Sequence, residues 1–528
     1  MSSVKSRFHL WLILLGLPFV VRYALWLVWR HGFTWGDGLF YATIAEQFFQ
    51  FGTAHDYLLL FPPGYPLVVD LFRFLLTLDG ALVLASVVAG SVLPLLVWLI
   101  ARMITEERVA WYAWALTCCS PLLLGLSLER LADSLFIALI VGALGSLVAF
   151  YRTARMGWFA TYCLLSALSV QTKPEGLVLV AVQSLLCLFL FRSFTPVRRL
   201  LLVGILWVTV GLVGLPYWFF LHERADVWIL SGKAPLNLLH ARAKAVTSDH
   251  SKELEMVYKK AFALDASGRL AFLTRRDGFF KYVLEDPARA SQVYWSNVKR
   301  GLSVLSPAAI PLLVVMCIGI VGMWGAGQRV ILVLAASVVV LIFFPPFFVS
   351  LAQPSFHPGR LAGPVVPSLI LLASLGVRRI GTALRGSRLD FWIVIAWTVG
   401  CLVFACHETI RLDRANRGEK QLIDLHCSRV SRWLALNTSQ DTVIASTSLL
   451  DDAYSGRRSV WLPWEDPPQL VDYLRSKGVT YLLQEWGGGL LSPGIKPSTV
   501  NPDSVGLEPI VFLSVAPEVT VYRILPGS

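Results

Sequence analysis

Long apolar runs separated by short polar stretches fill most of the chain. Eleven of these runs approach the length of about 20 residues that a helix needs to cross a membrane. They lie at about 10–30, 80–101, 109–127, 131–151, 156–171, 176–192, 199–221, 303–324, 328–350, 361–376 and 389–408. The pattern predicts a polytopic α-helical membrane protein with about 11 transmembrane helices over residues 1–408.

The pattern changes after residue 408. "DTVIAST" and "VTYLLQEW" are typical of short strands, and "DPPQLVDYLRSKG" predicts a helix between them that ends at Gly478. "PIVFLSV" and "VTVYRIL" predict two closing strands. We therefore expect residues 409–528 to form a small soluble α/β domain.

The shorter apolar run 64–79 decides on which side of the membrane every later segment lies. It contains Asp70 and Arg73. If it crossed, the basic clusters at 152–155 and 377–388 would face outside, although Lys and Arg prefer cytoplasmic loops. We therefore predict a half-inserted or juxtamembrane helix, with the N-terminus inside and the C-terminal domain outside.

Composition supports a membrane protein and argues against a nucleic-acid partner. Apolar residues make up 56% of the chain and charged residues 15%, against roughly a quarter charged in soluble domains. The net charge of +12 comes from short basic clusters between apolar runs. No cluster of His, Cys, Asp and Glu has the spacing of a zinc site, so we expect no tight metal site.

The first outer loop, 31–63, shows an amphipathic pattern at helical spacing. Its apolar face would carry Phe40, Ile44, Phe48 and Phe51, and its polar face Thr43, Glu46, Gln47 and Gln50. This predicts a short helix lying in the membrane interface. Asp37 precedes it, either as an N-cap for free backbone N–H groups or as a functional carboxylate facing a pocket. "FPPGYPL" then stops the segment, because proline cannot continue a helix.

The predicted topology gathers several polar segments on the outer face. They are 31–63, "SLERLAD" at 127–133, "QTKPEG" at 171–176, the large loop 222–302, "AQPSFHPGR" at 352–360 and the C-terminal domain. Carboxylates, prolines and a few cations therefore converge there, which indicates a site.

Four motifs in this order resemble the GT-C glycosyltransferases, closest to their protein O-mannosyltransferase and lipid A aminoarabinose transferase branch. They are the acidic residue before "GLFYATIA" with the following "PPGYPLVV", then "SPLLLGLSLERLADSLFIALIVGAL", "LSVQTKPEGLVLV" and "HPGRLAGPVVPSLILLASLG". Together they span roughly residues 10 to 376. Two positions depart from the family pattern. The family often has Lys before the Pro-Pro pair, where this chain has Phe61, and its acidic pair is single here because Gly38 follows Asp37.

The resemblance implies a hexosyl- or pentosyltransferase of a bacterial inner or plasma membrane. It would move a sugar, with inversion, from a polyprenyl-phosphate donor to a glycan, lipid or protein acceptor at the outer face. Asp37 is the candidate general base, and Asp133 is the second candidate catalytic carboxylate. We expect no cofactor, with a divalent cation held by Asp37 and Asp133 as the alternative.

Cations near the site would stabilise the charge of the departing phosphate. The predicted substrate-binding set is Lys173, Glu175, His357, Arg360, Tyr41 and Glu129. Simpler interpretations exist for some of these residues: Glu129, Arg130 and Asp133 as a solvated turn, and Lys173 with Glu175 as a local ion pair.

Two further questions stay open at this point. The large loop 222–302 is either a lid that carries Lys233, Arg275 and Arg276 as anion contacts or a solvated spacer. The alternative function is a transporter or flippase of a lipid-linked glycan. A transporter would place ionisable residues near the middle of the membrane on broken helices and show an inverted repeat, whereas the charged residues of this chain crowd the outer helix ends.

Overall fold

The computed structural model describes residues 9–28, 37–52, 55–190, 194–226, parts of 228–299, 363–383, 388–486, 502–513 and 518–526. Its backbone contacts divide the chain into two compact units. The helical unit comprises Met1–Arg30, Leu82–Pro216 and Gln292–Asp413. The loop-and-tail unit comprises His31–Ala81, Tyr217–Ser291 and Arg414–Ser528. Segments of the first outer loop, the large loop and the C-terminal domain therefore share one unit.

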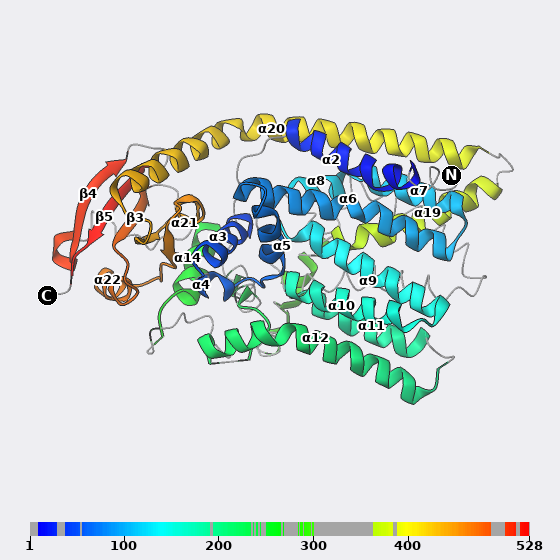
Figure 1. Cartoon of the computed structure of the whole chain (residues 1–528), viewed down its shortest axis with the longest axis horizontal. Helices are drawn as coiled ribbons and strands as arrows, with labels where there is room; N and C mark the ends of the chain where they lie inside the picture. The colour runs from blue at the N-terminus through cyan, green and yellow to red at the C-terminus, as the bar shows by residue number, and fades with distance from the viewer. Residues whose placement is uncertain are drawn as a thin grey trace. The chain divides into compact units, whose positions relative to one another are not determined.

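The helical unit consists of apolar helices, several of which run side by side (Figure 1). Its elements are η1 (Leu12–Gly16), α2 (Leu17–Val28), most of α6 (Leu78–Ile104), α7 (Glu107–Cys119), α8 (Pro121–Leu128), α9 (Asp133–Thr153), α10 (Met156–Thr172), α11 (Gly176–Leu190), most of α12 (Pro196–Ala225), η4 (Gly363–Val365), α19 (Val366–Ala383) and the first part of α20 (Leu389–Asn437). Among the described residues, five helices are long and apolar enough to cross a membrane, or six if the bent pair α7 and α8 counts as one span.

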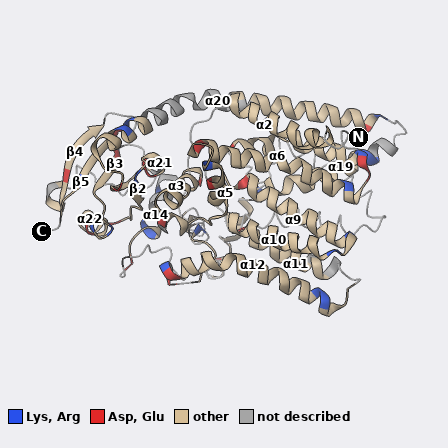
Figure 2. Ribbon diagram, in the orientation of Figure 1, with Lys and Arg blue, Asp and Glu red and all other residues tan. Residues whose placement is uncertain are grey.

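These helices confirm the predicted polytopic α-helical fold. The charged residues of α12 lie at its two ends, Arg198 and Arg199 near its start and Glu223 and Arg224 near its end. The middle of the helix is therefore uncharged (Figure 2). α9 packs along α10, and α10 along α11. The predicted runs 303–324 and 328–350 lie outside the described residues.

The predicted run 109–127 is one apolar segment broken into α7 and α8, which are bent by 51°. The break falls at Ser120, whose backbone is extended (φ −60°, ψ 117°), just before Pro121 at the first position of α8. A residue before proline is pushed out of the helical region by the proline ring, and proline itself fits well at the start of a helix. The sequence "SP" therefore causes the bend.

The run 64–79 forms a short helix followed by a turn. α5 spans Gly64–Arg73, ten residues in all, which amounts to about 15 Å at 1.5 Å per residue. That is about half of a hydrocarbon layer of about 30 Å. The length agrees with a half-inserted or juxtamembrane helix, and the side of the membrane on which the later segments lie stays a prediction.

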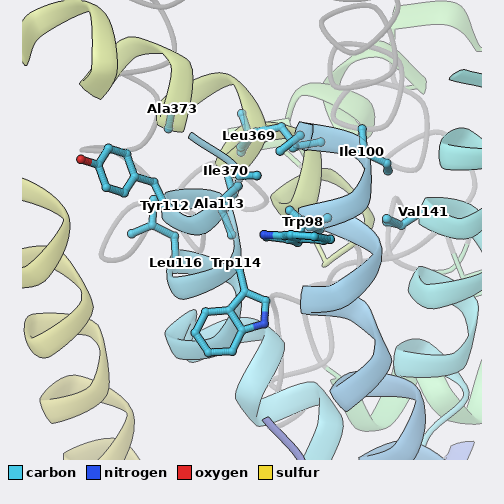
Figure 3. Packing of buried hydrophobic residues seen from close by; sticks show 14 of the residues in the cluster. Trp98, Ile100, Tyr112, Ala113, Trp114, Leu116, Val141, Leu369, Ile370 and Ala373 are labelled. Carbon is cyan, nitrogen blue, oxygen red and sulfur yellow. The ribbon is translucent and has the colours of Figure 1, made fainter. Parts of the chain in front are cut away.

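The core of the helical unit lies where α6, α7, α9 and α19 meet (Figure 3). Trp98 and Trp111 pack edge to face with ring centroids 5.9 Å apart, and Trp111 packs in the same way on Trp114 at 5.7 Å. Leu369 and Ile370 of α19 are completely buried in this cluster. Large rings on α6 and α7 and aliphatic side chains on α19 thus fill the space between the helices.

The loop-and-tail unit contains the α/β domain predicted at the C-terminus. Its helices are α3 (Asp37–Phe51), α4 (His55–Leu58), α5, α14 (His250–Ala261), the last part of α20, α21 (Leu449–Tyr454) and α22 (Pro467–Ser476). Its strands are β1 (Val443–Ser446), β2 (Arg458–Val460), β3 (Tyr481–Trp486), β4 (Leu507–Leu513) and β5 (Glu518–Ile524), and a one-turn helix, η5 (Pro502–Val505), precedes β4.

The five strands form one mixed sheet in the order β2-β1-β3-β5-β4. β1 pairs in parallel with β2 and β3, and β5 pairs antiparallel with β3 and β4. Gly478 follows α22 with φ +71°, a left-handed conformation that suits glycine after a helix. The predicted strands and the α22 helix are confirmed, whereas β2 and α21 were not predicted.

The two faces of α3 do not differ in burial as their polarity would suggest. Thr43, Glu46 and Gln47 on the polar face are buried, and Gln47 is only 1% exposed. Phe48, assigned to the apolar face, is 41% exposed. The period of the sequence was right, but the polar side packs against the protein instead of facing water.

Candidate functional site

The first outer loop and the large loop meet at an ion pair. Asp37 is the first residue of α3, where free N–H groups and the helix dipole favour a negative side chain. Its Oδ2 accepts a hydrogen bond from Lys233 Nζ at 2.8 Å, and the two side chains are 20% and 17% exposed, respectively. The carboxylate is therefore paired and still reachable from solvent.

Hydrogen bonds of the residues just before Lys233 fix its place. Ser231 Oγ donates to the carbonyl oxygen of Leu60 at 2.8 Å. Gly232 N donates to the carbonyl oxygen of Leu59 at 2.9 Å. These bonds fasten the large loop to the segment that ends at the Pro-Pro-Gly turn, and they bring Lys233 to Asp37 across 196 residues of sequence.

Lys233 lies over the residue that departs from the family motif. Its Nζ is 4.5 Å from the centroid of the Phe61 ring, a cation–π contact. Phe61 occupies the position before Pro-Pro where the family often has lysine. The structure thus places a cation directly over that position, delivered by the large loop. From the sequence, Lys233 is only one of three candidate anion contacts in that loop.

Aromatic rings pack around Phe61 and support the Asp37–Lys233 pair. Tyr41, predicted to bind substrate, is 1% exposed. Its ring packs edge to face on Phe61 at 5.2 Å and on Tyr65 at 5.1 Å. In this structure Tyr41 therefore holds the Phe61 ring on which the Lys233 ammonium lies.

A second lysine–carboxylate pair lies in the helical unit. Lys173, the residue that follows α10, donates from Nζ to Oδ1 of Asp133 at 2.8 Å. Asp133 begins α9. The side chains are 8% and 2% exposed, respectively, and Lys173 Nζ also lies 5.6 Å from the Phe136 ring centroid. Asp133 and Lys173 therefore bond to each other, a pairing that the sequence did not predict.

The structure decides between two interpretations of the neighbouring charges. Glu129, Arg130 and Asp133 are all buried, so the solvated turn is wrong. Lys173 pairs with Asp133 across the helices, and Glu175 is half-buried.

A side chain at the nearby Gly176 would bring its Cβ within 2.9 Å of the Ser169 backbone. Glycine is therefore required for the close packing of this turn.

Other predicted residues lie outside the described part of the chain: His357, Arg360, Arg275 and Arg276. Within the described residues, no group of three or more His, Cys, Asp and Glu side chains is placed to hold a metal ion. The carboxylates considered for a divalent cation, Asp37 and Asp133, each bond to a lysine.

Polar contacts around α3 were missed by the sequence. Arg73 Nη1 lies 2.7 Å from Glu46 Oε2, and burial raises the pKa of Glu46 although Arg73 opposes the rise. Tyr57 donates its hydroxyl to Oδ2 of Asp452 at 2.7 Å, and burial raises the pKa of Asp452 well above its usual value. No local sequence signal marks Asp452, since its partner is 395 residues away.

The fold is similar to that of ArnT from Cupriavidus metallidurans, whose structures are known in the apo state and bound to undecaprenyl phosphate. Each matches with 14% identity and a TM-score of 0.57, over 97% of this chain and 99% of that chain. It is also similar to the archaeal oligosaccharyltransferase AglB from Archaeoglobus fulgidus, in complex with an inhibitory peptide and a dolichol-phosphate. There the identity is 13% and the TM-score 0.50, over 91% of this chain and 70% of that chain. These likenesses confirm the GT-C fold. No protein-family model and no curated protein matches the sequence.

Proposed function

We propose that this chain transfers a sugar from a polyprenyl-phosphate donor to an acceptor at the outer face of the membrane, with inversion and with Asp37 as general base. The observation that carries the proposal is the Asp37–Lys233 pair over Phe61. A candidate base and a candidate phosphate-binding cation stand next to each other where the large loop meets the segment that resembles the GT-C motif. The likeness of the fold to a protein bound to undecaprenyl phosphate supports a lipid-phosphate donor.

The reaction gives each of the two side chains one task. The acceptor hydroxyl oxygen attacks the anomeric carbon while the bond from that carbon to the phosphate oxygen breaks. Asp37 takes the hydroxyl proton, and the polyprenyl phosphate leaves with the electron pair. A lysine ammonium within hydrogen-bond distance stabilises the charge that develops on that phosphate. Lys233 is the described residue best placed for this task.

The Asp37–Lys233 ion pair would control when the base acts. Lys233 Nζ lies 2.8 Å from Asp37 Oδ2, so the carboxylate is engaged by the ammonium while the two side chains stay paired. A donor phosphate competes with Asp37 for the ammonium. Donor binding would then release the carboxylate, so that the base becomes active only when the leaving group is in place.

The buried pair has a different place in the proposal. Asp133 and Lys173 join the start of α9 to the end of α10, and both are almost sealed from water. We assign Asp133, the second candidate catalytic carboxylate, to a positioning role in which it holds the Lys173 ammonium in place. Glu175, Glu129, His357 and Arg360 stay proposed donor contacts, whereas Lys173 is committed to Asp133 and Tyr41 acts through Phe61.

Mass spectrometry of lipid-linked sugars and surface glycans tests the function directly. Cells that lack the gene should accumulate a polyprenyl-phosphate sugar and lose one glycan modification. Complementation with the intact chain should restore the modification, and complementation with Asp37→Asn should not. Unchanged lipid-linked sugars and glycans in the deletion strain would contradict the proposal.

Two observations favour the alternative, a transporter or flippase of a lipid-linked glycan. Arg22 lies completely buried inside the first apolar span, and its Nη1 donates to the Pro18 carbonyl oxygen at 3.3 Å. The α7–α8 break is the kind of discontinuity that transporters use. Incubation of the purified chain in detergent with the polyprenyl-phosphate sugar and an acceptor separates the two functions, because a transferase forms a new glycosidic bond there and a flippase forms none.

A further inference from the structure

The polar face of α3 is fastened to the edge of the C-terminal sheet. Gln47 Nε2 donates to the carbonyl oxygen of Arg457 at 3.1 Å, and Gln47 Oε1 accepts from Ser459 N at 3.2 Å. These two backbone groups belong to β2 and the residue before it, and β2 stands at the edge of the sheet. The side-chain amide therefore binds β2 as a neighbouring peptide group would, satisfying an edge that would otherwise lack a partner.

A stack of aromatic rings joins the same strand to the Lys233 site. Trp461 directly follows β2, and its ring stacks on Phe40 of α3 with centroids 5.6 Å apart and planes 12° apart. Phe40 in turn packs on Phe61 at 5.1 Å, and Phe61 carries the Lys233 ammonium. The path from the sheet to the cation consists of rings in direct contact.

A third contact holds the segment between α3 and the Pro-Pro-Gly turn. Tyr57 packs on Trp461 with centroids 5.2 Å apart, and its hydroxyl donates to Asp452 of α21. Hydrogen bonds from Gln47 and Tyr57 and the face of Trp461 thus bind both arms of the first outer loop to the C-terminal domain. All of these groups are buried, and a buried hydrogen-bonding group that loses its partner is costly.

We propose that the C-terminal domain is the positioning element of the Asp37–Lys233 pair, and that Gln47 and Trp461 are its positioning residues. Gln47 fixes the rotation of α3 about its axis and so the direction in which Asp37 points, ten residues away on the same helix. Trp461 fixes the positions of the Phe40 and Phe61 rings and so the position of the Lys233 ammonium. The consequence for catalysis rests on the proposed function, whereas the positioning itself does not.

Chemical labelling of the Lys233 amine tests the proposal in the full chain without any substrate. Reductive methylation with formaldehyde and a borohydride modifies a lysine more slowly when its amine is held in an ion pair. The rate at Lys233 is followed by peptide mass spectrometry. Lys173, paired and buried in the other unit, is the internal reference for general loosening of the fold.

The variants differ in how many of the Gln47 bonds they keep. Gln47→Met removes both, and we expect methylation of Lys233 to become roughly five- to thirtyfold faster, the range that one or two lost interactions produce. Gln47→Glu keeps only the acceptor and should give an intermediate rate. Trp461→Leu should also accelerate labelling. The matched control is Gln50→Met, on the same helix but exposed, which should match wild type.

Two results would overturn the positioning role. One is equal labelling of Lys233 in Gln47→Met and Gln50→Met. The other is an equal acceleration at Lys173, since this would show general destabilisation. A separate arm adds undecaprenyl phosphate to wild type, where the proposed function expects protection of Lys233. Lack of protection there counts against the proposed function and leaves the labelling of the variants to decide the positioning role.

Discussion

The two units contain the same pair of functional groups in different surroundings. Asp37–Lys233 and Asp133–Lys173 have identical Nζ–Oδ distances of 2.8 Å. Both lysines also touch a phenylalanine ring, Phe61 and Phe136, respectively. The pairs differ in exposure, because the side chains of the first are 20% and 17% exposed and those of the second 2% and 8%.

This difference separates a pair that can exchange partners from a pair that holds structure together. A partly exposed ion pair is worth little, because water screens it and replaces either partner cheaply. The phosphate of a ligand can likewise replace Asp37 as the partner of Lys233. A sealed pair cannot lose one partner without leaving a charge in a medium of low dielectric constant. We therefore expect substitutions in the first pair to change chemistry and substitutions in the second to change stability.

The largest effect should follow from Asp37→Asn. Asparagine can still accept a hydrogen bond at the start of α3 but is not a proton acceptor, so sugar transfer should fall by about 10²–10⁴-fold, the range typical of general-base catalysis. Thermal unfolding should change little. Transfer by membranes from cells expressing each variant is the measurement, with the exposed Asp472→Asn as control. A fully active Asp37→Asn chain would leave Asp37 as no more than the first residue of a helix.

The sealed pair should give the opposite pattern. Lys173→Met leaves Asp133 buried beside an apolar side chain, which costs about 3–5 kcal/mol when one partner of a buried ion pair is removed. The double variant Lys173→Met with Asp133→Asn should regain much of that stability, because no charge is then left unpaired. Thermal unfolding in detergent measures both. If the double variant is no more stable than Lys173→Met, the two residues do not act as one structural pair.

The open pair should show its exchange of partners in lipid binding. Lys233→Met removes a charge-assisted hydrogen bond to phosphate, so affinity for undecaprenyl phosphate should fall roughly ten- to a hundredfold. Lys233→Arg should keep most of the affinity. Raising the salt concentration should weaken binding by wild type more than by Lys233→Met, because only wild type offers this cation. Equal affinity in Lys233→Met and wild type would move the phosphate to other cations.

The sequence predicted those features of the two units that depend on patterns within a single helix or strand. Apolar runs set the positions of α6, α9, α10 and α12, and strand patterns set β1, β3 and β5, because side-chain periodicity reflects burial within one element. The motifs also marked Asp133 and Lys173 as candidate residues, although not as partners of each other. These features depend on neighbours that lie close together in the sequence or in a recognisable motif.

What the sequence left out depends on distant partners. Lys233 is an ordinary charge in a polar loop, and only the bonds of Ser231 and Gly232 to the first outer loop bring it over Phe61. A polar helix face looks the same whether it meets water or the backbone of β2, which is why the sequence places Gln47 on a polar face without indicating its partner. β2 itself is three residues long, too short for its period to be recognised.

The smallest expected effect comes from a third carboxyl, which meets a hydroxyl in place of an ammonium. Asp452 accepts from Tyr57, and burial raises its pKa well above the usual value. With the folded pKa above the unfolded value of about 3.9, the folded chain holds a proton that the unfolded chain has released. Stability then falls as the pH rises from about 4 through the folded pKa. Burial raises the pKa of Glu46 and Glu485 as well, so wild type should lose stability over this window through several groups.

Asp452→Asn removes only one of these groups, and its amide oxygen can still accept from Tyr57. As the pH rises above about 4, the melting temperature of wild type should therefore fall further than that of the variant, with a difference of a few degrees. Asp472→Asn, an exposed carboxyl in the same domain, is the matched control and should follow wild type. Parallel curves for all three proteins would mean that Asp452 is already ionised in the folded chain. Burial next to a hydroxyl would then not be enough to keep the Asp452 carboxyl protonated, and Asp452 would not differ in this respect from carboxylates that are paired with a lysine.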